Sequence, residues 1–338
     1  MALAAVASFW MLSAALSAAP SAVTAHFEKV TDHYFLCQPS RESWNVGAVI
    51  TDEGVLLIDP PAEADLATVQ EALRRASPKA VKWVVHTDLR REIDGTASHF
   101  VRQGAVVLGS QELSRLVAEA AKPPGVPVAG NEPKPDEKRA AGNRAPRLTF
   151  DRQMRLFPSG VEVRILAVLH RARTAGDTVV VLPNEKVLQT GDLYTPAGFP
   201  EVDVQAGGSA GGWVDGLRQV VDAVPVLKAA IPQPRTEPVP KTPGRPPVNL
   251  ADPSRGVDEE RPLEESIAVV PGRGVASNLM EMKSLLESAQ KLRSEIMRSK
   301  GRLNVSNAAS LAPYRSLANF ESFAALLNEE ASRLRQSP

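Results

Sequence analysis

The order of short strands and amphipathic helices is the feature that most constrains the fold of this chain. Residues 27–59 hold four short runs that alternate apolar and polar residues or are wholly apolar, with turn residues between them. Apolar residues at helical spacing predict a helix over 63–76, and an apolar strand is predicted at 81–85. The pattern continues as helix, strand and helix over 98–103, 105–108 and 111–121. This alternation by itself predicts an α/β fold.

A second series of strands and helices follows, broken by two proline-rich segments. The segments cover 122–147 and 232–262, and we expect both to be extended insertions in one domain over 26–338. A helix is predicted after Trp213, where apolar residues recur at helical spacing. The other elements of this half are predicted as strands at 148–150, 154–157, 161–168, 178–182, 187–190 and 267–271 and helices at 279–296 and 320–334.

Composition and the N-terminal residues restrict the possible partners and the cellular location. The chain has 39 basic and 39 acidic residues, so it has no net field to attract nucleic acid. The lone Cys37 excludes an internal disulfide and is predicted to be a small buried residue on a strand. Residues 1–25 are rich in alanine and apolar residues, which is typical of a signal peptide. We therefore expect export to the periplasm or the exterior, and no membrane span after residue 25.

Residues 84–95 carry the most specific motif. They read Val-Val-His-Thr-Asp-Leu-Arg-Arg-Glu-Ile-Asp-Gly. This segment resembles the metal loop of the metallo-β-lactamase superfamily, Thr-His-x-His-x-Asp-His-x-Gly, in which Thr87 and Gly95 match without a gap. The resemblance implies a four-layer αββα sandwich of two mixed β-sheets flanked by helices. It also implies a site for two zinc ions, whose first four ligand positions here are Asp88, Arg90, Glu92 and Ile93.

Four further stretches carry the same resemblance in the same order. The opening strands are similar over 45–59 and end in Asp59. The segment 169–178 places Arg173 where the family has a histidine ligand. The strand at 187–193 ends in Gly-Asp, so Asp192 matches the aspartate that bridges the metals. The segment 269–275 places Arg273 at the last histidine. Of the seven ligand positions that the resemblance implies, only Asp192 is unchanged.

These substitutions argue against zinc. Zinc prefers imidazole nitrogen and thiolate ligands, whereas a guanidinium stays protonated and has no lone pair to offer a metal. We therefore expect no zinc cofactor and assign no catalytic residue. The arginines are expected to converge with the carboxylates of the former site. They would form either a charge-balanced plug or a pocket for a small anion. Auxiliary positions are Asp59, His86, Asp94 and His170.

The sequence thus favours a secreted binding or scaffold protein over a dizinc hydrolase, and its enzymatic status stays open. The partner is expected to be a protein or a small anionic ligand. The alternative is an atypical metal-dependent hydrolase with an oxygen-rich site made by Asp88, Glu92 and Asp192 together with His86 or His170. A third possibility, serine catalysis in Gly207-Gly208-Ser209-Ala210-Gly211, is disfavoured because no histidine follows the serine. This glycine-rich run is expected instead to be a flexible loop beside the cleft.

Overall fold

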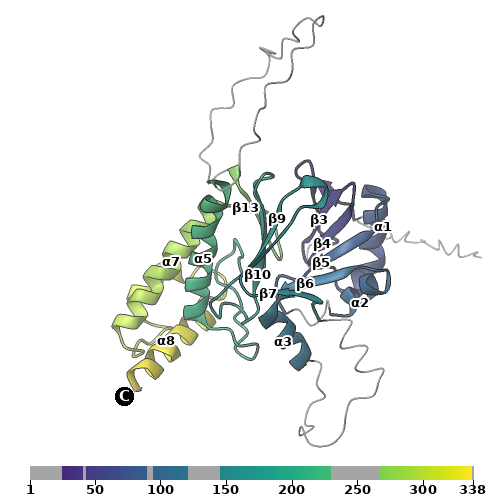
Figure 1. Ribbon diagram of the computed structural model, residues 1–338. Helices are drawn as coiled ribbons and strands as arrows, with labels where there is room; N and C mark the ends of the chain where they lie inside the picture. Colours follow the sequence, from purple (N-terminus) through teal and green to yellow (C-terminus); the bar gives the residue numbers. More distant parts are fainter. Residues whose placement is uncertain (1–24, 41–42, 90–93, 121–144, 230–265, 337–338) are drawn as a thin grey trace, which may run out of the picture.

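Two β-sheets packed face to face form the centre of the molecule (Figure 1). The computed structural model describes residues 25–40, 43–89, 94–120, 145–229 and 266–336. The predicted signal peptide, except for Ala25, lies outside these residues, as do all of the second predicted insertion and most of the first. Among the helices of the described part, none is long and apolar enough to cross a membrane.

The first sheet has the strand order β1-β2-β3-β4-β5-β6-β7. Its first four strands are antiparallel neighbours, and β4, β5, β6 and β7 run parallel to one another. The strand bounds are β1 Glu28–Lys29, β2 Tyr34–Cys37, β3 Val46–Thr51, β4 Gly54–Ile58, β5 Val81–Val85, β6 Val106–Ser110 and β7 Leu148–Phe150. Cys37 is fully buried on β2, which confirms its predicted place.

The second sheet has the order β13-β12-β11-β10-β9-β8. Only β11 and β12 are parallel neighbours, because a helix connects them across the outer face. The bounds are β8 Gln153–Leu156, β9 Val163–Ala167, β10 Thr178–Leu182, β11 Val187–Gly191, β12 Ala268–Pro271 and β13 Ser277–Asn278. Both sheets are therefore mixed, as the sequence predicted.

Helices cover the outer face of each sheet. Helices α1 (Leu66–Ala76) and α2 (Asp94–Arg102) pack on the first sheet, and α5 (Ala210–Ala229), α7 (Leu279–Arg298) and α8 (Phe320–Gln336) pack on the second. Helix α3 (Gln111–Ala120) follows β6 directly. Short 3-10 turns occur at Glu63–Asp65, Pro158–Gly160 and Ala309–Tyr314. The helix predicted from Ser98 begins four residues earlier, at Asp94, because tertiary packing outweighs the weak helix propensity of Gly95 and Thr96.

The alternation of side chains along β4 explains the layered core. Val55 and Leu57 belong to the apolar cluster beneath α1 and α2, whereas Leu56 and Ile58 belong to the cluster between the sheets. All four side chains are fully buried, since successive residues of a strand point to opposite faces and both faces of this strand are covered. The described chain is thus an αββα sandwich.

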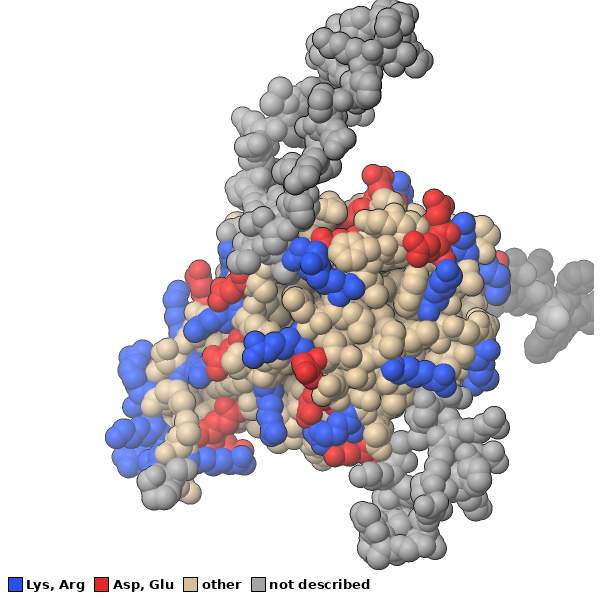
Figure 2. All heavy atoms as spheres, viewed as in Figure 1, with Lys and Arg blue, Asp and Glu red and all other residues tan. Residues whose placement is uncertain are grey.

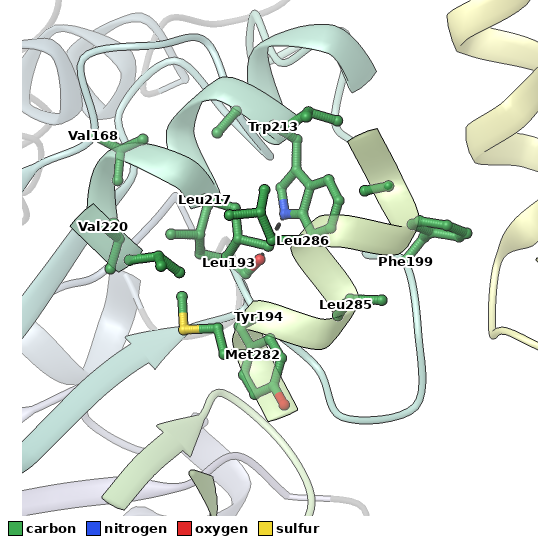
Figure 3. Packing of buried hydrophobic residues seen from close by; sticks show 14 of the residues in the cluster. Val168, Leu193, Tyr194, Phe199, Trp213, Leu217, Val220, Met282, Leu285 and Leu286 are labelled. Atoms are coloured by element: carbon green, nitrogen blue, oxygen red, sulfur yellow. Dashed lines mark hydrogen bonds between the residues drawn. The ribbon is translucent and has the colours of Figure 1, made fainter. Parts of the chain in front are cut away.

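The third apolar cluster lies between the second sheet and its helices (Figure 3). Trp213 on α5 is its largest fully buried side chain and donates a hydrogen bond of 2.7 Å from Nε1 to the carbonyl oxygen of Leu193. The rings of Phe199 and Phe323 contact Trp213 edge-on, with centroids 6.0 and 5.1 Å away. This cluster joins α5, α7 and α8 to the loop that follows β11.

Candidate functional site

The carboxyl ends of several strands place the predicted site residues at one edge of the sandwich. Asp59 follows β4, and His86, Thr87 and Asp88 follow β5, which runs parallel to β4. Asp192 follows β11, and its parallel neighbour β12 leads into Arg273. Parallel strands in one sheet end at the same edge, where α/β proteins commonly bind ligands.

Asp59 is fully buried at this edge and forms hydrogen bonds with residues of both sheets. Its carboxylate accepts hydrogen bonds from the Thr87 amide (2.8 Å) and the Thr87 hydroxyl (2.8 Å). Its backbone adopts a φ of 53°, a left-handed conformation that aspartate tolerates better than most residues. Gln189 Nε2 lies 3.5 Å from the carboxylate, and Gln189 Oε1 accepts a 2.8 Å bond from the Tyr34 hydroxyl. Asp59 therefore joins the two sheets through buried hydrogen bonds, which is a structural role.

Asp88 and Arg173, at two of the positions where the sequence resemblance implies metal ligands, lie beside each other in the structure. Arg173 Nη1 lies 3.4 Å from Asp88 Oδ2. The Asp88 side chain is 2% exposed and that of Arg173 is 18% exposed, so the pair is largely shielded from water. A carboxylate held against a guanidinium has its charge compensated there. Part of the predicted convergence of arginines and carboxylates is therefore present.

Arg273 lies against an aromatic ring, whereas Arg173 lies against a carboxylate. It is exposed, and its guanidinium carbon lies 5.3 Å from the centre of the Trp44 ring, a cation–π contact. Asn45 fixes the loop that carries it, because Asn45 Nδ2 donates to the carbonyl oxygens of Pro271 (2.8 Å) and Gly274 (2.9 Å). No sequence motif contains Trp44, and Asn45 was matched only as the start of an opening strand. Their role depends on a contact between segments more than 200 residues apart.

The remaining predicted positions divide into two groups. Among the described residues, His86 is buried, Asp192 is partly buried and His170 is exposed. The second group lies outside the described residues and comprises Arg90, Glu92, Ile93 and the side chain of Asp94. Within the described part of the chain, no cluster of three or more histidine, cysteine, aspartate or glutamate side chains is arranged to hold a metal ion.

The described donor set does not fit zinc. Asp88 faces an arginine, and Arg173 and Arg273 stand where the sequence resemblance implies histidines. A fixed positive charge at the ligand positions repels a divalent cation, and a guanidinium cannot coordinate one. The chemistry of hydrolysis by a zinc-bound hydroxide therefore has no support from these side chains.

Asp177 is a buried acid behind the loop that carries Arg173. The Thr174 amide donates to Oδ2 (2.9 Å) and the Thr174 hydroxyl donates to Oδ1 (2.6 Å). Burial raises the pKa of Asp177 from 3.8 to about 6, against the opposing effects of the Thr174 hydrogen bonds and the Arg173 charge. The sequence contains Asp177 in the matched segment, but its burial could not be inferred from the pattern.

We expect the pKa of Asp177 to produce a measurable pH dependence of stability. Because its folded-state pKa lies above the ordinary value, the folded state retains a proton that the unfolded chain has released between pH 4 and 6. This contribution is largest at acid pH and is lost as the pH rises through about 6. Relative to Asp177→Asn, the free energy of unfolding should fall by about 2 kcal/mol between pH 4 and 7. Urea unfolding at both pH values measures this difference. The same change in the free energy of unfolding with pH in both proteins would contradict the prediction.

The glycine-rich run from Gly207 to Gly211 differs in part from the predicted flexible loop. Ala210 to Gly212 form the first turn of α5, so the expected flexible loop is wrong for these residues. Ser209 precedes the helix, and its hydroxyl oxygen accepts the Gly212 amide at 3.0 Å and donates to the Arg171 carbonyl at 3.1 Å. The serine is thus a helix cap that also binds the neighbouring loop.

Solved structures with the same architecture include several metallo-β-lactamases. The DIM-1 metallo-beta-lactamase matches with a TM-score of 0.53 and 15% identity, over 79% of this chain and 97% of that chain. A metallo-beta-lactamase from Pontibacter korlensis gives 0.54 and 16%, over 79% and 99%. FIM-1 from Pseudomonas aeruginosa, solved in a mono-zinc form, gives 0.52 and 13%, over 80% and 96%. No family model matches the chain, and no curated protein matches its sequence.

The chain therefore has the metallo-β-lactamase fold, as the sequence motifs predicted. At identities of 13–16% this similarity establishes the fold and leaves the activity to be argued from the site itself.

Proposed function

We propose that this protein is a non-catalytic binding protein built on the metallo-β-lactamase fold, with a cleft remodelled by arginine and aspartate. The observation that supports the proposal is the ion pair between Asp88 and Arg173. It joins two positions at which the sequence resemblance implies metal ligands.

The arginines at this edge of the sandwich support an anionic ligand. A planar guanidinium recognises carboxylates and phosphates through paired N–H donors, and it keeps its charge at all physiological pH values. Arg173 retains 18% exposure of its side chain, and Arg273 is exposed on the loop after β12. On the face shown in Figure 2, basic and acidic side chains are interspersed and no single sign dominates. Selectivity would therefore come from local arginines and not from a global field.

We expect the purified protein to contain well under one zinc ion per chain. Six of the seven ligand positions that the resemblance implies are substituted, and three of them carry arginine, whose positive charge opposes a cation. Elemental analysis of protein purified without chelator measures this directly. Two zinc ions per chain, removable by chelator with loss of a hydrolytic activity, would overturn the proposal. Stoichiometric calcium, magnesium or manganese would favour the oxygen-rich site of the alternative hydrolase.

A variant that restores the zinc ligands implied by the resemblance tests whether the scaffold can still hold zinc. The restored variant carries Asp88→His, Arg90→His, Glu92→Asp, Ile93→His, Arg173→His and Arg273→His. If the scaffold retains the parent geometry, this variant should bind zinc, and the same variant with Arg173 left in place should bind it far more weakly. Failure of the folded, fully restored variant to bind zinc would mean that the loops, as well as the ligands, have changed.

Export is part of the same proposal and rests on the apolar, alanine-rich residues 1–25. We expect the protein isolated from its native host to begin near His26. N-terminal sequencing of cell fractions tests this, and a cytosolic protein that begins at Met1 would contradict it.

A further inference from the structure

The loop that carries Arg173 is held by three successive carbonyl groups. The Arg171 and Ala172 carbonyl oxygens accept the Ser209 amide at 3.1 and 3.0 Å, and the Arg173 carbonyl accepts the Asp203 amide at 2.9 Å. The fit is close, since a Cβ added to Gly208 would lie 2.1 Å from the Arg173 carbonyl oxygen. The backbone of Arg173 is therefore set by the segment that leads into α5.

The start of α5 is in turn held by the C-terminal helix α8. The two carboxylate oxygens of Glu330 accept the amides of Ala210 (2.8 Å) and Gly211 (2.9 Å). These are amides of the first helical turn, which have no partner within the helix, and the helix dipole favours a negative charge there. Gly211 allows this approach, because an added Cβ would lie 2.8 Å from Glu330 Oε2.

Helix α7 contributes a second contact at the same place. Arg293 Nη1 donates to Asp215 Oδ1 at 2.7 Å and lies 3.4 Å from the Gly211 carbonyl oxygen. The two C-terminal helices, which lie in the same outer layer as α5, thus fix its first turn, and Ser209 links that turn to the Arg171–Arg173 loop.

We infer that Glu330 is a positioning residue for the Asp88–Arg173 pair and sets the Arg173 guanidinium against Asp88 through the N-terminus of α5. This inference rests on the proposed function, because it treats Arg173 as a group that recognises the ligand.

The test compares Glu330→Gln with Glu329→Gln in the full chain. Glu329 is the adjacent residue of α8 and is exposed, where it pairs with Arg333. The signal is the Nε–H resonance of Arg173, assigned by its absence in Arg173→Lys. In Glu330→Gln we expect this resonance to shift and its exchange with solvent to accelerate by about tenfold, because the local opening that exposes it becomes easier. Glu329→Gln should leave both unchanged.

A merely structural role for Glu330 predicts another outcome. If Glu330→Gln lowers the urea midpoint but leaves the Arg173 resonance and its exchange unchanged, Glu330 only caps α5 and the inference fails. Glu330→Asp keeps the charge and shortens the side chain, so the Arg173 resonance should shift in the same direction by a smaller amount. This variant replaces Glu330→Gln in the test if Glu330→Gln does not fold. The zinc content of the unmodified protein is independent of this result, so the two proposals fail separately.

Discussion

Replacing Asp88 by alanine should lower the free energy of unfolding by about 3 kcal/mol, the lower part of the range for breaking one side of a buried ion pair. The change leaves the Arg173 guanidinium without the carboxylate 3.4 Å away, in a place where its side chain is only 18% exposed. Removing Arg173 as well removes the charge that the first change leaves behind. Asp88→Ala combined with Arg173→Leu should therefore recover part of the loss.

Urea unfolding of the two single variants and the double variant, analysed as a cycle, gives the coupling energy. The surface pair of Arg333 and Glu329, with side chains 71% and 56% exposed, is the matched control and should couple by only about 0.5 kcal/mol. A coupling between Asp88 and Arg173 as small as that of the control would show that this pair is solvated. The oxygen-rich metal site would then become the stronger hypothesis.

The second large effect is expected at Trp213. Trp213→Ala should cost about 4 kcal/mol, because it leaves a cavity in the cluster on the outer face of the second sheet. The indole is fully buried, contacts Phe199 and Phe323 edge-on and donates a hydrogen bond to Leu193. Trp213→Phe keeps much of the apolar volume but leaves the Leu193 carbonyl without its donor, so about 1–2 kcal/mol should be lost.

The control for Trp213 is Trp83 on β5, which is only partly buried and has the Lys82 ammonium over its ring. Trp83→Ala should cost less than half as much, since the energy of a truncated aromatic side chain scales with the contacts it loses. Equal losses at the two tryptophans, measured by chemical unfolding, would show that the outer layer around α5 is loosely packed.

The sequence alone predicted the elements whose patterns are local. Leu66, Val69 and Leu73 recur at helical spacing, and the structure has α1 at Leu66–Ala76. The apolar run after Gly54 predicted a buried strand, and β4 occupies Gly54–Ile58. Five motifs in order predicted the metallo-β-lactamase fold, which the structure has. These features depend on the spacing of residue types along the chain, which can be read directly from the sequence.

The residue types at Asp88, Arg173 and Arg273, where the resemblance implies histidine ligands, are likewise a property of the sequence, and the residue type decides whether a lone pair is available for a metal. What those side chains do instead was decided by tertiary structure. Arg173 lies against Asp88, while Arg273 turns to Trp44 on a loop that Asn45 holds from the opposite end of the chain. A guanidinium can pair with a carboxylate or lie over an aromatic ring. Only the folded chain determines which partner is within reach, because those contacts join segments far apart in sequence.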